Sequence, residues 1–246
     1  HKGLEINEDQ FIFHDADDLW GTKVGACQKL LAEKLGKKKF GKLCIGPAGE
    51  NLVKYASIIS DERASGRTGL GAVLGWKNLK AITVSGNHEI PIYNKEKTTA
   101  WCKKWFKYLK NHPLTGNQLP KLGTAGLVSS MQMCGLLSTK NYSAGQFEHF
   151  EDVSGERLAE EFNITNKGCL TCPIRCARTV MVDGKQVKGP ELETLGLLGG
   201  NICNNDLQKI LDWNYELDEL GMDTISAANT IAYAMEANEQ GLWDNG

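Results

Sequence analysis

The chain has 246 residues, of which 41% are hydrophobic and 24% charged, and its formal net charge is −2. This composition is typical of a globular protein with one large domain or two of ordinary size, and it excludes a disordered chain. Because positive charge is not in excess, we expect no nucleic acid and no anionic membrane as partners, and no apolar run reaches the 18 residues of a membrane helix.

Eight cysteines form no regular extracellular framework and the first residues do not resemble a signal peptide, so we expect a cytoplasmic, reducing environment. The chain begins at His1 without a Met and stops at Asp244-Asn-Gly246. These ends are typical of a piece cut from a longer protein.

The first fifty residues predict a hairpin, a helix and a buried strand, at residues 4–14, 21–35 and 42–46. The hairpin turn is expected at residues 7–9. The acidic run 15–18 is the expected N-terminal signal of the helix, and the three lysines at 37–39 predict a solvated turn.

Residues 46–86 are rich in glycine, and the loop 66–71 carries three glycines around Arg67 and Thr68. Glycine lets backbone N–H groups approach an anion, and arginine offers a planar fork for phosphate. The loop lacks the Gly-Lys-Ser/Thr end of a P-loop, and no suitable strand leads into it as in a dinucleotide fold. A phosphate cradle and a tight structural loop both remain open. A strand at 79–84 closes the region.

After a boundary near residues 86–95 the pattern becomes helical. A helix at 98–110 carries Trp101, Trp105, Phe106 and Leu109 on one side, a stripe more typical of a core than of a cofactor contact. Residues 136–150 predict a loop. Further helices are expected at 124–134, 153–162, 205–220 and 225–240. Residues 181–185 predict a turn between two short strands.

Three thiols occur within eight residues, because Cys169, Cys172 and Cys176 have the spacing C-x2-C-x3-C. One tight loop with this spacing can direct three sulfurs at a common centre, as an iron–sulfur cluster or a zinc ion requires. Ordinary buried cysteines or disulfides fit this clustering less well. Zinc sites usually include a second Cys or His pair, so the spacing favours a [4Fe-4S] cluster over zinc. The fourth ligand is not obvious, and the nearest later cysteine is Cys203.

Further motifs occur in order along the chain, at Gly46-Pro-Ala-Gly-Glu-Asn51, Arg63–Gly75, Lys77–Ala81, Gly123–Gly126, Thr139–Tyr142, Pro190–Leu195 and Asp218–Asp223. Together with the cysteine loop they resemble the aldehyde ferredoxin oxidoreductase family of tungsten-pterin enzymes. Each motif is weak alone, but their common order is specific and covers nearly the whole chain.

Members of that family are longer, with a β-rich base domain covered by two mostly helical domains. The resemblance implies an α+β fold in which residues 1–88 are the latter part of the cofactor-base domain. Residues 95–246 would then be a mostly helical domain that carries the cluster cysteines and the first pterin motif. The start of the first domain and the whole third domain would lie outside this chain.

The resemblance also implies cofactors. Family members hold tungsten, or molybdenum in some relatives, between two pterins, with a [4Fe-4S] cluster close by. The three cysteines of the loop correspond to three cluster ligands, and the family's fourth cysteine would lie outside this chain. The glycine loop corresponds to the segment near the pterin phosphates and their bridging Mg²⁺, so Arg67 and Gly69 are candidate phosphate contacts.

The segment Asp218-x-x-Gly-x-Asp223 corresponds to the family's first pterin motif, with Met222 where leucine is usual. Both aspartates are candidates to accept hydrogen bonds from pterin N–H groups, with Gly221 permitting the turn and Thr224 beside it. Without the family context, the same residues predict a helix stop followed by an Asp cap.

The implied reaction is two-electron oxidation of an aldehyde to a carboxylic acid under anaerobic conditions, with electrons leaving through the cluster. Glu193 corresponds to a family glutamate near the metal and is the candidate general acid/base, with Glu191 as second candidate. Ferredoxin and a small aldehyde are the implied partners, and the longer parent is compatible with a homo-oligomer. A family member with a different substrate or electron acceptor is one alternative. The other is an inert fragment that folds without pterin or cluster, and we expect this fragment alone to be inactive.

Overall fold

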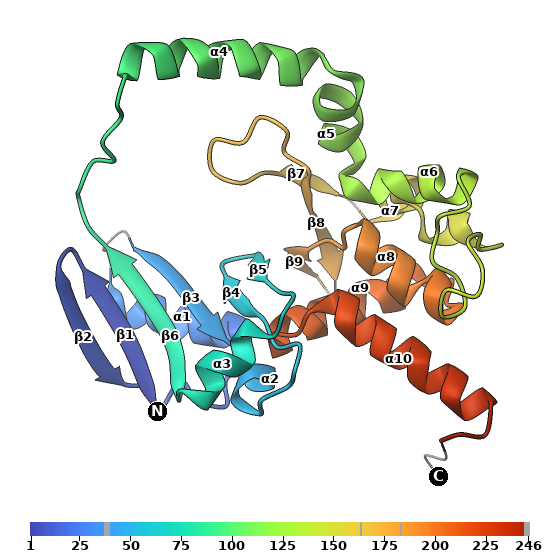
Figure 1. Cartoon of the computed structure of the whole chain (residues 1–246), viewed down its shortest axis with the longest axis horizontal. Coiled ribbons are helices and arrows are strands. Elements are labelled where there is room, and N and C mark those ends of the chain that lie inside the picture. Colours follow the sequence, from blue (N-terminus) through green and yellow to red (C-terminus); the bar gives the residue numbers. More distant parts are fainter. Residues whose placement is uncertain (37–39, 163, 183, 244–246) are drawn as a thin grey trace. The chain divides into compact units, whose positions relative to one another are not determined.

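The structure is a computed structural model that describes residues 1–36, 40–162, 164–182 and 184–243. It divides into two compact units (Figure 1). Unit 1 comprises His1–Glu89 and Tyr215–Ala227, and unit 2 comprises Ile90–Asn214 and Ala228–Gly246. The predicted turn at 37–39 and the centre of the predicted turn at 181–185 lie outside the described residues. In the described ranges, no helix is long and apolar enough to cross a membrane.

Unit 1 is built on a six-stranded sheet with the order β2-β1-β6-β3-β4-β5. The first two strands form the predicted hairpin; β1 also pairs in parallel with β6, and β3 pairs antiparallel with both β6 and β4. The sheet is thus mixed, with a long central strand at β6. The strands are β1 (Lys2–Asn7), β2 (Gln10–Asp15), β3 (Gly41–Ile45), β4 (Ile58–Ser60), β5 (Arg63–Ser65) and β6 (Leu79–Ser85).

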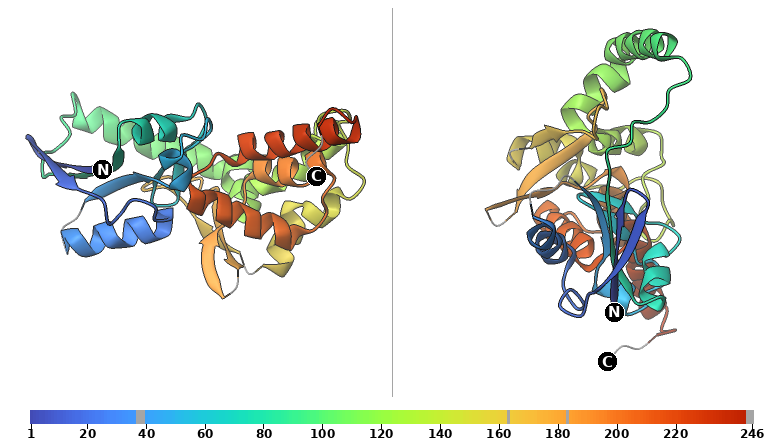
Figure 2. Two further views of the ribbon diagram at one scale, coloured as in Figure 1. Left: turned by 90° about the horizontal axis from the view of Figure 1, so that it is seen from below. Right: turned by 90° about the vertical axis from the view of Figure 1, so that its left-hand side faces the viewer.

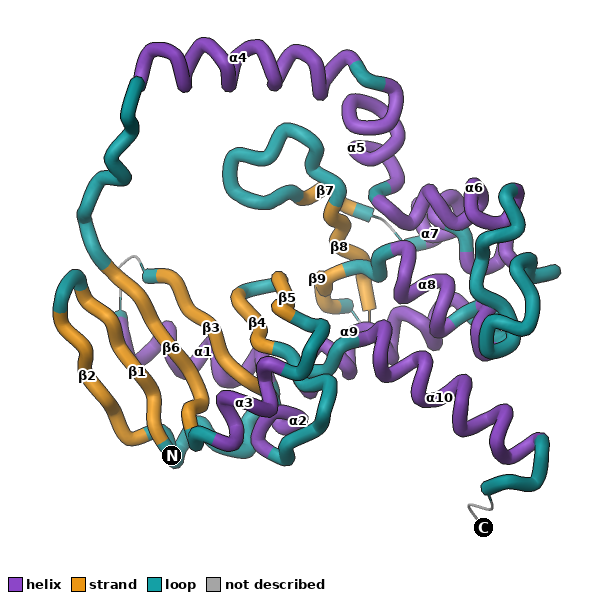
Figure 3. Tube along the Cα trace, in the orientation of Figure 1, coloured by secondary structure: helices purple, strands orange, loops and turns teal. Residues whose placement is uncertain are grey.

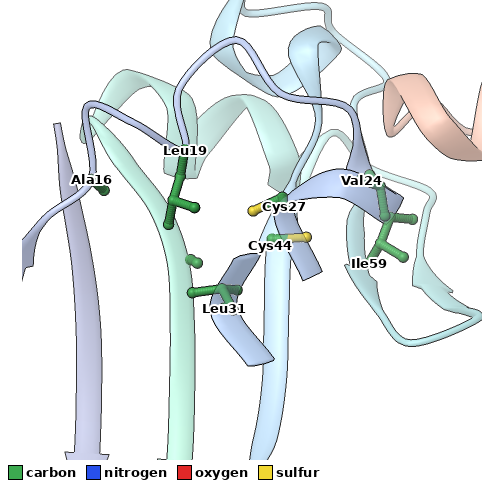
Figure 4. Close-up of a cluster of buried hydrophobic side chains, with 8 residues drawn as sticks. Ala16, Leu19, Val24, Cys27, Leu31, Cys44 and Ile59 are labelled. Atoms are coloured by element: carbon green, nitrogen blue, oxygen red, sulfur yellow. The ribbon is translucent and has the colours of Figure 1, made fainter. Parts of the chain in front are cut away.

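Helix α1 (Val24–Leu35) covers one face of this sheet, and α3 (Leu70–Trp76) lies against the opposite face (Figure 2). A single helical turn, α2 (Pro47–Glu50), follows β3 directly. The core between α1 and the sheet is a cluster of small and aliphatic side chains in which Cys27 and Cys44 are fully buried neighbours (Figure 4). Its members are Ala16, Leu19, Val24, Cys27, Leu31, Cys44, Ile59 and Ala81.

The start of α1 differs from the prediction, because the acidic run 15–18 does not cap it. The N-cap is Lys23, whose side chain makes no capping hydrogen bond. Instead, the Gly25 N–H donates to the two carboxylate oxygens of Glu219 at 3.1 and 3.3 Å. The helix end is therefore satisfied by a residue 194 positions away, which no local pattern could indicate.

Unit 2 combines a small antiparallel sheet, with the order β7-β8-β9, and most of the helices (Figure 3). This confirms the predicted α+β class. Residues 215–227, at the junction of the last two helices, belong to unit 1. The elements are β7 (Thr165–Lys167), β8 (Ala177–Val182), β9 (Lys185–Lys188), α4 (Lys95–Asn111), α5 (Leu119–Leu122), α6 (Val128–Met133), α7 (Gly155–Glu161), α8 (Leu192–Leu198), α9 (Leu207–Leu220) and α10 (Thr224–Glu239).

The aromatic stripe of α4 does not lie in a core, so that prediction was wrong. Trp101, Trp105 and Phe106 are 56%, 58% and 48% exposed, and no residue of the helix is buried. Periodicity reports which side chains share a face, but not whether another element covers that face. Together with Pro173 of the cysteine loop, the stripe lines an open cavity of about 510 Å³.

Candidate functional site

In unit 1, the motif at Asp218–Asp223 lies beside the chain segment that leads into β4. The Ser57 N–H donates to the Gly221 carbonyl at 2.8 Å, and the Asp223 N–H donates to the Tyr55 carbonyl at 3.0 Å. Ala56 and Met222 pair as an isolated antiparallel bridge. The backbone of the motif is therefore fixed by backbone contacts with residues 55–57, just before β4.

Glycines make this close approach possible. A Cβ atom at Gly46 would lie 2.3 Å from the Leu220 carbonyl oxygen, and Gly221 has a φ of +72°, which favours glycine. A Cβ at Gly75 would lie 1.9 Å from the Gly49 carbonyl oxygen. We call the segments 46–51, 66–75 and 218–223 the glycine junction, because their backbones pack directly against one another.

The glycine loop meets Asp223 within this junction. A Cβ at Gly66 would lie 3.3 Å from Asp223 Oδ1 and 3.4 Å from Ser57 Oγ. Asp223 is 6% exposed, and its Oδ2 accepts hydrogen bonds from the N–H and hydroxyl of Ser226 at 3.0 and 2.5 Å, which caps α10. Arg67, the next residue of the loop, is exposed. The structure therefore confirms that the motif contains a helix end followed by an Asp cap.

Sequence reasoning did not identify Ser57. This residue is fully buried, and in the described part of the chain its hydroxyl has no hydrogen-bond partner. A serine in an apolar segment carries no recognisable motif, so only the fold reveals its place beside Asp223. Gly69, with a φ of +74°, belongs to the same junction, since a Cβ there would lie 2.1 Å from the Lys54 carbonyl oxygen.

Two motifs of unit 1 are also joined by a buried ion pair. Glu50 belongs to the Gly46–Asn51 motif and Lys80 belongs to the Lys77–Ala81 motif, and their side chains are 5% and 0% exposed. Lys80 Nζ also donates to the Thr22 carbonyl at 3.0 Å, and the Glu50 carboxylate accepts from the Gly21 N–H at 3.0 and 2.9 Å. The pair ties α2 and β6 to the chain that precedes α1.

In unit 2, the cysteine loop connects β7 to β8 (Figure 3). The Cys172 N–H donates to the Cys169 carbonyl at 3.0 Å, so the first two cysteines flank a turn. Cys169 is exposed, Cys172 and Cys176 are partly exposed, and in the described part of the chain none of the three forms a disulfide. Across the described ranges, no three His, Cys, Asp or Glu side chains come together as a metal-binding group. Cys203 lines a separate cavity beside α10.

Arg178 follows the last cysteine closely and is only 3% exposed. Its Nη1 donates to the carbonyls of Ala177 at 2.7 Å and Arg175 at 3.3 Å, and its Nη2 donates to the Leu119 carbonyl. Its Nε has no partner among the described residues. A fully charged guanidinium is thus buried against neutral carbonyls directly behind the cysteine loop.

The cysteine loop and the candidate acid/base are linked through Gly123 and Thr124. A Cβ at Gly123 would lie 2.6 Å from the Cys176 carbonyl oxygen. The Thr124 hydroxyl donates to Glu191 Oε2 at 2.5 Å and accepts from the Leu192 N–H at 3.1 Å, which fixes Glu191 at the N-cap of α8. Burial lowers the pKa of the Arg178 guanidinium, whereas the charges of Cys176 and Glu191 raise it. Glu193, in the first turn of α8, is exposed.

Among the described residues, three buried side-chain atoms have no hydrogen-bond partner, and they lie near the glycine junction and the cysteine loop. In the part of the chain that the structure describes they are Ser57 Oγ, Asn166 Oδ1 and Arg178 Nε. Ser57 lies beside the glycine junction, to which its N–H donates at the Gly221 carbonyl. Asn166, which donates to the Arg175 carbonyl at 3.2 Å, and Arg178 flank the cysteine loop. A buried polar group left unpaired costs about 1–3 kcal/mol, so each one calls for a partner. The three thiols are the donor type that an iron–sulfur cluster needs, and the unpaired polar atoms suit a polar cofactor, although no three donors converge within the described residues.

Comparisons with known proteins identify the relatives of this chain. Residues 1–86 match the family model of the aldehyde ferredoxin oxidoreductase N-terminal domain, and residues 100–246 match the model of domains 2 and 3. Tungsten-containing aldehyde ferredoxin oxidoreductases of Thermococcus kodakarensis and Pyrococcus furiosus are each 42% identical over 240 residues, covering 97% of this chain and 40% of the relative. The WOR-like subunit of an aliphatic sulfonate oxidoreductase of P. furiosus is 27% identical over 272 residues, covering 97% of this chain and 41% of that protein.

Among solved structures, the active-site complex BamBC of benzoyl coenzyme A reductase has a TM-score of 0.80 and 23% identity, covering 99% of this chain and 39% of that chain. At this identity the likeness shows a shared fold. The chain spans about 40% of the length of the curated relatives that it matches. Because the two family models together cover nearly all of its residues, the chain belongs to the aldehyde ferredoxin oxidoreductase family.

Proposed function

We propose that this chain is part of an anaerobic, cytoplasmic oxidoreductase that converts aldehydes to carboxylic acids at a tungsten or molybdenum bis-pterin centre. Electrons leave through a [4Fe-4S] cluster to ferredoxin. The observation that carries the proposal is where the unpaired buried polar atoms of the described residues lie: Ser57 Oγ beside the glycine junction, and Asn166 Oδ1 and Arg178 Nε beside the cysteine loop. In a globular protein the hydrogen bonds of such atoms are completed by a ligand or by an ordered water.

The glycine junction would hold the pterin. Asp218 and the Oδ1 of Asp223 would accept hydrogen bonds from pterin N–H groups, and the backbone of Gly221 and Met222, together with Thr224, would fix their direction. In the glycine loop, Arg67 is exposed and would form a planar fork on a pterin phosphate, Gly69 would allow close approach of the backbone, and Mg²⁺ would be held with the phosphates. The chain's part is to orient the cofactor and exclude water.

In unit 2, Cys169, Cys172 and Cys176 would bind three irons of the cluster, with the fourth ligand supplied from outside this chain. When bound, the tungsten-pterin group supplies the two-electron oxidation. Glu193 is exposed and accepts a proton as water adds to the aldehyde carbonyl, whereas the Glu191 carboxylate is already engaged by Thr124 and serves better to hold α8 in position.

Metal content of the anaerobically purified chain tests this proposal. Tungsten or molybdenum together with several irons per chain supports it, and Cys172→Ser should then lower iron while leaving tungsten in place. The matched control is Cys102→Ser, an exposed thiol on α4, which should leave both metals unchanged. Zinc alone, or no metal, would contradict the cofactor assignment and favour the inert fragment. In the longer parent protein, aldehyde-dependent reduction of ferredoxin tests the substrate class.

A further inference from the structure

The buried guanidinium of Arg178 is the strongest feature that the proposed function does not yet use. Its carbonyl contacts satisfy both terminal nitrogens but provide no negative charge, and its Nε–H donor remains free among the described residues. The Glu191 carboxylate faces the guanidinium, but in the described residues the hydrogen bonds of Arg178 all go to neutral carbonyls. Burying a guanidinium in this way is unfavourable, and it cannot lose its proton to escape the cost. The protein therefore has a buried positive charge and an unpaired N–H donor next to the cysteine loop.

The Arg178 side chain lies in a space that two neighbouring glycines leave for it. On one side, a Cβ at Gly123 would lie 3.2 Å from Arg178 Nη2. On the other, the Gly189 N–H donates to the Arg178 carbonyl at 2.9 Å, and a Cβ at Gly189 would lie 3.2 Å from Arg178 Cβ. Two glycines thus clear the space for this side chain. The Arg178 guanidinium also connects the cysteine loop to α5, because it donates to the Arg175 carbonyl in the loop and to the Leu119 carbonyl in α5.

The chemistry of the loop indicates what this charge serves. Cys176 lies two residues before Arg178, and the ionisable groups that face the guanidinium are the Cys176 thiol and the Glu191 carboxyl. A cluster held by thiolates carries a net negative charge, and net charge and hydrogen bonds to the sulfurs set its reduction potential.

We propose that Arg178 is a positioning residue and the cationic partner of an iron–sulfur cluster in the cysteine loop, holding Cys176 in place and donating its Nε–H to a cluster sulfur. This rests on the proposed function, in that the loop binds such a cluster. A positive charge stabilises the more negative reduced cluster, so Arg178 raises the reduction potential. The residue acts through charge and hydrogen bonding and takes no part in the reaction at the pterin metal.

The test compares the wild-type chain with Arg178→Met, Arg178→Gln and Arg178→Lys after anaerobic reconstitution with ferrous iron, sulfide and 2-mercaptoethanol, whose thiolate supplies the fourth cluster ligand. The readouts are iron per chain, the midpoint potential from a redox titration followed by electron paramagnetic resonance, and the thermal melt. We expect both neutral variants to shift to lower potential and Arg178→Lys to restore part of the shift. Arg157→Met, which removes an exposed arginine paired with Glu161 on α7, should leave the potential unchanged.

Each outcome decides the question. Loss of iron from a neutral variant with an unchanged melt supports the positioning of Cys176. Neutral variants that keep the cluster at the wild-type potential overturn the proposal. Variants that lose iron only because both neutral replacements unfold also overturn it, since Arg178 would then serve stability alone. A wild-type chain that takes up no iron contradicts the cluster itself, and hence the proposed function, which separates that failure from the failure of Arg178.

Discussion

The buried ion pair between Lys80 and Glu50 makes a sharp prediction about stability. Removing one partner leaves the other charge uncompensated in a region with almost no solvent access, since the side chains are 0% and 5% exposed. Lys80→Met leaves the Glu50 carboxylate with only the Gly21 N–H, and Glu50→Gln leaves the Lys80 ammonium with the Thr22 carbonyl and an amide. Each single change should cost about 3–5 kcal/mol, the usual penalty for breaking a buried pair.

The double variant Lys80→Met/Glu50→Gln should recover most of this loss, because it removes both buried charges while keeping an acceptor for the Gly21 N–H. The assay is urea denaturation followed by tryptophan fluorescence and circular dichroism, analysed as a double-mutant cycle. The control is Lys34→Met, which breaks the exposed pair with Asp18 and should cost less than about 1 kcal/mol. If Lys80→Met cost no more than Lys34→Met, the argument from burial would be refuted.

Three further predictions concern unit 1. Gly75→Ala should destabilise the chain by more than about 2 kcal/mol in the same assay, because its Cβ would overlap a backbone oxygen, whereas Gly3→Ala, with no atom nearer than 4.0 Å, should not. Alkylation followed by mass spectrometry should find Cys27 and Cys44 protected, because both are fully buried, while the exposed thiols react quickly at Cys102, Cys134, Cys169 and Cys203. Burial raises the pKa of Glu219 above its ordinary 4.5. Between the ordinary pKa and the raised pKa the folded state binds more protons than the unfolded state, so the stability of the wild-type chain falls as pH rises through that window. Glu219→Gln should remove this loss of stability.

The outcomes that contradict these predictions are equally direct. Equal stability of the two alanine variants would show that the glycine junction is looser than its contacts indicate. Labelling of Cys27 at the rate of Cys102 would show that the core between α1 and the sheet opens readily. For Glu219, the stability of the wild-type chain minus that of the glutamine variant should fall as pH rises. A rise would show that the Gly25 N–H outweighs burial, and a flat difference would show that the two effects cancel.

The local patterns of the sequence determined much of the fold. Alternation predicted the β1–β2 hairpin, and helical periodicity with capping residues predicted α7, α9 and α10, because these signals depend on neighbours within a few positions. The short elements α2, β5 and α3 were not predicted, since glycine-rich segments carry little periodicity and the surrounding backbone imposes their conformation.

The candidate residues show the same division. The spacing of three cysteines and the Asp218–Asp223 motif could be recognised from the chain alone, because the chemistry requires particular residue types at short intervals. Only tertiary structure placed Ser57 beside Asp223, capped α1 with Glu219 and buried Arg178 behind the cysteine loop. These contacts join residues far apart in sequence, or depend on whether an element is covered, and burial and hydrogen-bond satisfaction are properties of the packed chain that no local pattern contains.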